Sequence, residues 1–153
     1  MNNKNKDIFK GISACPSMIA ENINSDKSEL SHWPIQLKLI KTSAQIFENA
    51  NLLIAADCTA YACKDFHNDF IKGHVTTIGC PKLDDVEFYK KKLIEIFENN
   101  NIKSVKVVKM SVPCCSGISI IVKQALKEAK KDIPYSEVTI DVDGTLGLNC
   151  AAI

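Results

Sequence analysis

The sequence predicts a single α/β domain, built as a doubly wound, mostly parallel sheet with helices on both faces, of the flavodoxin or Rossmann type. The first observation behind this prediction is that short apolar or β-branched runs alternate with amphipathic segments of helical length, which is the order of strand–helix–strand units. The second is that 153 residues, 46% hydrophobic and 24% charged, correspond in size and composition to one ordinary globular domain. We therefore expect a flexible tail at residues 1–10 and one domain over residues 11–153.

The first third of the chain is the least regular part of the pattern. Residues 1–10 are polar, and residues 11–34 indicate irregular structure with a helical turn. Apolar residues alternate at a period of two over residues 35–40, which predicts a strand. Residues 44–50 predict a short helix.

A regular rhythm of strands and helices begins at residue 51. The expected strands are 51–56, 75–79, 102–112 and 138–142. The first expected helix, 59–72, ends at Gly73, the next begins at the caps Asp84 and Asp85, and Ser116-Gly117 opens the last one. The apolar stripes of the last two helices are Val86, Tyr89, Leu93, Ile96 and Phe97, and Ile118, Ile121, Val122, Ala125, Leu126 and Ala129. The turn pair Asp143-Gly144 closes the last strand.

The charge balance excludes several classes of protein. With 19 basic and 18 acidic residues the net charge is +1, so the basic excess typical of a nucleic-acid binder is missing. Every basic residue is a lysine, which excludes mechanisms that depend on an arginine clamp. No apolar run approaches the roughly 20 residues that span a membrane, and the first seven residues are not followed by the apolar stretch of a secretory signal. We expect a cytoplasmic protein without nucleic-acid or membrane partners.

The positions of the cysteines are the most informative feature of the sequence. Three consecutive expected strands end in cysteine, at Cys58, at Cys80 and at the pair Cys114-Cys115. Ligands of open α/β sheets bind beyond the carboxyl ends of the strands, so parallel strands would bring four sulfurs to one edge of the sheet. The total of seven cysteines is odd, and without a secretion signal such residues act as ligands or redox thiols more often than as disulfides.

Four converging thiolates have a short list of uses, of which zinc and iron–sulfur binding lead. Adjacent cysteines do not suit a single zinc ion, whereas two neighbouring thiolates can bind different irons of one cluster. The helix after Cys114 and Cys115 would also favour their thiolate forms. We expect Cys58, Cys80, Cys114 and Cys115 to hold a 4Fe–4S cluster for electron transfer. The alternatives are thiol, disulfide or persulfide chemistry, an enzyme with an open cluster site, a structural zinc module, and cysteines that only fill the core.

Three further residues are weaker candidates for the same site. Cys63 lies five residues after Cys58 and faces either the pocket or the core. His67, on the same expected helix, is a candidate ligand or proton donor, or else a surface histidine. Cys15, in a Cys-Pro step, is either a cap over the pocket or a residue of the tail. The role of Cys150 stays open. Glycine-rich nucleotide-binding motifs are absent.

Several longer motifs resemble the C-terminal module of a family of anaerobe proteins described as 4Fe–4S ferredoxins. The motifs are Ala55-Ala56-Asp57-Cys58, Phe66-His67-Asn68-Asp69-Phe70, Gly79-Cys80-Pro81-Lys82-Leu83-Asp84-Asp85 and Val112-Pro113-Cys114-Cys115-Ser116-Gly117, with Leu30–Leu37 at the entry. The resemblance covers most of residues 12–145 and implies an iron–sulfur or redox context. Members of that family also carry an N-terminal C-x2-C-x2-C-x3-C-P segment, which this chain does not contain.

That difference bears on the partners we expect. A separate ferredoxin, another redox protein or a second copy of this chain would supply the missing electron-transfer function. Lysines gather in the C-terminal half, at 90–92, 103, 106, 109, 123, 127, 130 and 131. They form either a basic face for an acidic ferredoxin or the solvated faces of two helices and a strand.

Overall fold

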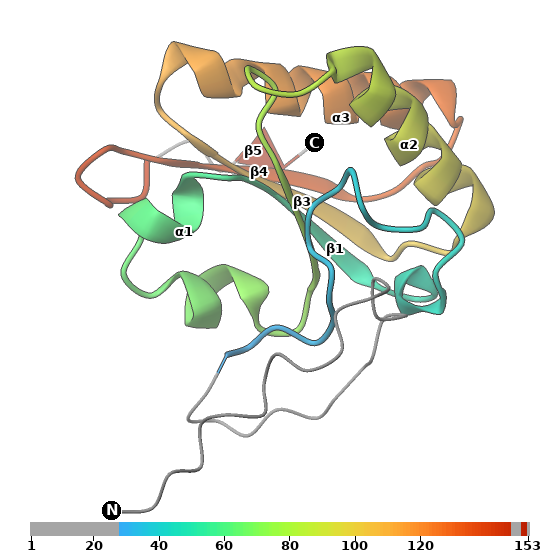
Figure 1. The fold of residues 1–153 in the computed structure, drawn as a ribbon, viewed down its shortest axis with the longest axis horizontal. Coiled ribbons are helices and arrows are strands. Elements are labelled where there is room, and N and C mark those ends of the chain that lie inside the picture. Colours follow the sequence, from blue (N-terminus) through green and yellow to red (C-terminus); the bar gives the residue numbers. More distant parts are fainter. Residues whose placement is uncertain (1–27, 148–150, 153) are drawn as a thin grey trace, which may run out of the picture.

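Five strands form one sheet in the computed structural model, which describes residues 28–147 and 151–152 (Figure 1). The strands are β1 (Asn51–Ala56), β2 (Val75–Gly79), β3 (Ser104–Met110), β4 (Tyr135–Ile140) and β5 (Ala151–Ala152). Their order across the sheet is β2-β1-β3-β4-β5. The first four run parallel, and the short β5, which the sequence did not predict, pairs antiparallel to β4. The predicted fold class, a single α/β domain with a mostly parallel sheet, is confirmed.

The core of the domain is centred on β1. In register, Ile54 pairs with Thr77 of β2 and with Val107 of β3. All five residues from Leu52 to Ala56 are 2% exposed or less. A strand covered on both faces needs a continuous apolar run rather than an alternating one, and this explains the sequence Leu-Leu-Ile-Ala-Ala at the centre of the sheet.

Helices cover both faces of the sheet, as expected (Figure 1). On one face lie α1 (Thr59–Ala62) and the π-helical turn η2 (His67–Ile71). On the other face α2 (Val86–Asn99) and α3 (Ser116–Glu128) pack side by side. Two short 3₁₀ turns complete the helices, η1 (Gln45–Phe47) and η3 (Pro113–Cys115). No helix of the described segments is both long and apolar enough to cross a membrane.

The amphipathic stripes of α2 and α3 are confirmed with two adjustments. Tyr89, Leu93, Ile96 and Phe97 are buried, but Val86, the first residue of α2, is 38% exposed. The cap of α2 is Asp85, whose carboxylate accepts hydrogen bonds from the backbone N–H groups of Glu87 and Phe88 at 2.9 and 3.1 Å. In α3 the predicted positions are buried apart from a half-buried Leu126.

Two predicted elements take other forms. Residues 35–40 are not a strand: one bridge joins Gln36 to Ile78 at the edge of β2, and a turn follows. The buried residues Leu37 and Ile40 are three apart, while Leu39 is 59% exposed, so this segment buries one side of a turn. The predicted helix 59–72 is broken after α1, because the backbone at the buried Cys63 is extended.

The end of this helical region is as predicted. Gly73, at φ +75°, follows η2 and stops it. The predicted tail at 1–10 and the predicted turn within residues 11–27 lie outside the described residues, and so do Cys15 and Cys150.

Candidate functional site

The carboxyl edge of the sheet contains the point at which the strand order reverses. The chain leaves β1 toward β2 on one side and leaves β3 toward β4 on the other, while β1 and β3 are neighbours. Such a switch point opens a crevice beyond the two strand ends, and ligands of open α/β sheets bind there. Cys58 follows β1 after one residue, and Cys114 and Cys115 follow β3 in η3. Cysteines therefore stand on both sides of the switch point.

The thiols of Cys58 and Cys114 lie close enough to Cys115 to affect its ionisation. Cys115 is 5% exposed, whereas Cys58 and Cys114 are exposed. Burial raises the pKa of the Cys115 thiol, and the neighbouring Cys114 and Cys58 thiols add to the rise, while a backbone hydrogen bond with Met110 opposes it. Cys115 is thus a protonated thiol at neutral pH in the absence of a metal.

Cys80, at the end of β2, belongs to the same edge. The backbone N–H of Asp57 donates to the carbonyl of Gly79 at 3.3 Å, so the ends of β1 and β2 are joined. A Cβ atom placed on Gly117, in the first turn of α3, would lie 3.2 Å from Cβ of Pro81. The residue after Cys80 therefore packs against the helix that begins directly after Cys115. Cys80 itself is half-buried.

The positive end of the α3 dipole lies at this edge. No side chain caps the helix, and its first turn contains no acidic residue. The backbone N–H of Ser116 already donates to the carbonyl of Pro113 in η3, so the attraction for negative charge comes from the dipole of the helix. A thiolate or an anionic cluster beside Cys115 would receive this stabilisation.

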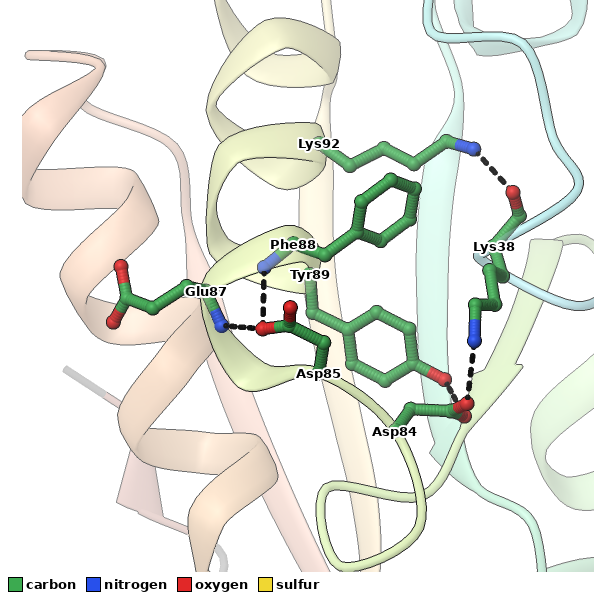
Figure 2. Close-up of polar contacts among 7 residues, drawn as sticks. All are labelled: Lys38, Asp84, Asp85, Glu87, Phe88, Tyr89 and Lys92. Carbon is green, nitrogen blue, oxygen red and sulfur yellow. Dashed lines mark hydrogen bonds and ion pairs between the residues drawn. The ribbon is translucent and has the colours of Figure 1, made fainter.

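A polar group that the sequence analysis did not identify lies between the ends of β1 and β2 (Figure 2). Asp84 accepts a hydrogen bond from the Tyr89 hydroxyl and pairs with Nζ of Lys38 at 3.2 Å. The hydrogen bond from Tyr89 is the main reason that the pKa of Asp84 lies below its ordinary value, and Lys38 adds to the effect. The cap of α2 is Asp85 alone. The prediction that Asp84 is also a cap is therefore wrong.

Asp57 joins this polar group to the cysteines. It is the residue before Cys58, and burial raises its pKa, with a further rise from the charge of Asp84. The sequence carried a signal for Asp57 in its position, since it directly follows an apolar run at the carboxyl end of an expected strand. It carried none for the hydroxyl of Tyr89, which periodicity identifies only as a core residue.

The weaker candidates lie apart from the strand ends. Cys63 is 6% exposed and belongs to the hydrophobic core. His67 is exposed, and its Nδ1 accepts a hydrogen bond from the backbone N–H of Glu29 at 3.2 Å, which ties the entry segment to η2. Within residues 28–147, no three His, Cys, Asp or Glu side chains are grouped closely enough to hold one metal ion.

Comparison with known proteins places the fold in a wider context. The family model that matches is described as a Rossmann-like domain, and it covers residues 44–151. An uncharacterized protein of Archaeoglobus fulgidus is 27% identical over 118 residues, which make up 77% of this chain and 83% of that protein. No solved structure matches the chain.

Proposed function

This chain belongs to the Rossmann-like domain family, and on that premise we propose that it binds an iron–sulfur cluster of the 4Fe–4S type and transfers electrons. Cys58, Cys114 and Cys115 would hold the cluster at the switch point, with Cys80 as the fourth ligand. The observation that carries the proposal is the placement of Cys58, Cys114 and Cys115 directly after β1 and β3, the two strands that flank the switch point. The resemblance to the C-terminal module of 4Fe–4S ferredoxins points in the same direction.

The arrangement suits a cluster better than a single zinc ion. One zinc ion requires four ligands at the corners of one small tetrahedron. A cluster is larger, and its thiolates bind separate irons, so its ligands stand farther apart. The adjacent pair Cys114 and Cys115 also favours a cluster, because neighbouring thiolates bind two different irons more readily than one and the same zinc ion.

The chemistry of Cys115 also favours a metal-binding role over a nucleophilic one. A reactive cysteine needs a lowered pKa, whereas burial raises the pKa of Cys115. Iron displaces the proton of a thiol when it binds, so a raised pKa weakens metal binding at low pH but does not prevent it at neutral pH. Metal-free thiol or persulfide chemistry is the second candidate, and it would use the exposed Cys58 and Cys114.

The proposal includes a location and a partner. The cytoplasm keeps thiols reduced and available to iron. The electron partner would be a separate ferredoxin or a related redox protein.

Anaerobic purification of the full chain, followed by iron and sulfide analysis and by visible and EPR spectroscopy, tests the proposal. We expect a brown protein with about four iron and four sulfide ions per chain. Serine variants of Cys58, Cys80, Cys114 and Cys115 should each lose most of the iron, whereas Cys63→Ala, which alters only the core, should keep it. A colourless protein that contains zinc, or a metal-free protein whose thiols are alkylated rapidly, would contradict the proposal in favour of the respective alternative.

A further inference from the structure

A cavity lies on the α1–η2 face of the sheet, apart from the cysteines. Its volume is about 340 Å³, which is at the lower end of the range for small-molecule sites. The entry segment, β1, α1, η2 and β2 all contribute to its lining. Most of the wall is apolar and includes Leu30, Ile35, Ala60, Phe66 and Ile78. The cavity would therefore take the apolar body of a small ligand.

Two polar atoms in the lining have no hydrogen-bond partner within the described part of the chain. Thr76 is 2% exposed and its Oγ1 is unpaired, and Oδ1 of Asp57 is buried and unpaired as well. Buried polar atoms in folded proteins are normally paired. Two neighbouring threonines show this: Thr59 donates to the carbonyl of Ala56 at 2.7 Å, and Thr77, the next residue in β2, donates to the carbonyl of Leu53 at 3.3 Å.

His67 adds a third polar group to the lining. Because its Nδ1 accepts the hydrogen bond from the Glu29 N–H, the proton of the neutral ring is on Nε2, which is a donor. The cavity thus combines a carboxylate acceptor, a hydroxyl and a ring N–H donor. A ligand hydroxyl, which both donates and accepts, can satisfy this combination, while a purely apolar molecule cannot.

We propose that this cavity binds a small, mostly apolar alcohol, whose hydroxyl group hydrogen-bonds to Asp57 and Thr76. The proposal goes beyond the cluster-binding function and does not depend on it, because none of the five cysteines that the structure describes lines the cavity. Asp57, the residue before Cys58, places the ligand's hydroxyl beside the cysteine edge.

NMR titration of the ¹⁵N-labelled full chain, without and with added iron and sulfide, tests the site. The probes are benzyl alcohol, toluene and benzylamine, which share one ring and differ in the polar group. We expect saturable binding of benzyl alcohol, with shifts confined to residues 55–61, 66–67 and 76–78, and about tenfold weaker binding of toluene, the usual effect of one lost hydrogen bond. The same result in the cluster-free protein would separate this site from the proposed function.

Three variants show whether the named atoms are responsible. Thr76→Val and Asp57→Asn should each reduce the preference for benzyl alcohol over toluene several-fold. Thr77→Val is the matched control, because it removes a buried hydroxyl from the next position of β2 that does not line the cavity, and it should leave the preference unchanged. Because Thr76 is a buried residue of β2, the dispersion of each variant's spectrum is compared with that of the wild type to check the fold. Asp57→Asn provides the independent test.

Several outcomes would overturn the proposal. They are absence of saturable benzyl alcohol binding, equal affinity for toluene, tighter binding of benzylamine, or shifts that lie mainly outside the cavity. An equal loss of preference in Thr77→Val would also overturn it, because the effect would then not come from the cavity.

Discussion

Replacing Gly79 with alanine should destabilise the fold by about 2.5–6 kcal/mol. The added Cβ would lie 2.5 Å from Oη of Tyr89 and 2.7 Å from two of its ring carbons, about 1 Å closer than a normal contact of roughly 3.5–4.0 Å. Tyr89 is 1% exposed, so its ring cannot turn into solvent. Overpacking costs about 1–3 kcal/mol. Breaking the hydrogen bond from the Tyr89 hydroxyl to the charged Asp84 adds about 1.5–3 kcal/mol.

A double-mutant cycle separates the contact from other effects of the substitution. Urea denaturation gives the free energy of unfolding for Gly79→Ala, Tyr89→Leu and the double variant, with an unchanged m-value as the check that the same transition is measured. Leucine lacks the atoms that would clash, so Gly79→Ala should cost less than about 1 kcal/mol in the Tyr89→Leu background. An equal cost in both backgrounds would refute the reasoning.

Gly73→Ala is the control for the general effect of losing a glycine. Gly73 has φ +75°, and no atom lies within 4 Å of the Cβ that alanine would add. Its substitution should therefore cost only the strain of the left-handed backbone, about 1–2 kcal/mol, and this cost should be the same with Tyr89 or Leu at position 89.

Three further predictions concern single residues. Burial lowers the pKa of His32 below its ordinary 6.5. The contribution of neutral His32 to stability should therefore be complete above about pH 6.5 and be lost as the pH falls further. Urea denaturation at several pH values should show a smaller loss of stability at low pH for His32→Gln than for the wild type. Asp85→Ala removes the cap of α2 and should lower stability by about 1 kcal/mol in thermal unfolding, with Asp85→Ser restoring most of it. Although burial opposes it, hydrogen bonds led by that from Lys109 lower the pKa of Glu137 from 4.5 to about 2. The stability that Glu137 contributes should be present above about pH 4.5 and lost below it, and Glu137→Gln should remove this dependence; an identical acid profile would contradict it.

The strands and the two long helices could be predicted because their residues obey one periodicity over a sufficient length. In β1 the apolar run is continuous, and in α2 the stripe recurs over three turns. The strand predicted at 35–40 was wrong because the segment is too short. Its six residues fit both a strand and a turn with buried residues three apart. Only its position at the edge of β2, a tertiary property, decides between them.

Only part of the candidate site could be predicted from the sequence. Which cysteines share an edge follows from strand order and direction, and a sequence with alternating strands and helices contains that information. The polar group of Asp84, Tyr89 and Lys38 depends on a close approach of one helix to Gly79, a position that has no side chain. No pattern in the sequence encodes that contact. The cavity could not be predicted from the sequence either, because residues from five separate segments line it.

The thiols at the carboxyl edge have no reason to meet before the sheet exists. Cys58 and Cys80 are 22 residues apart and Cys80 and Cys114 are 34 apart, so each pair is separated by a whole crossover whose closure is entropically costly. Until β3 has paired with β1, these thiols are not held together and can react with an oxidant or with one another. Any metal bound at this edge would stabilise only the completed sheet.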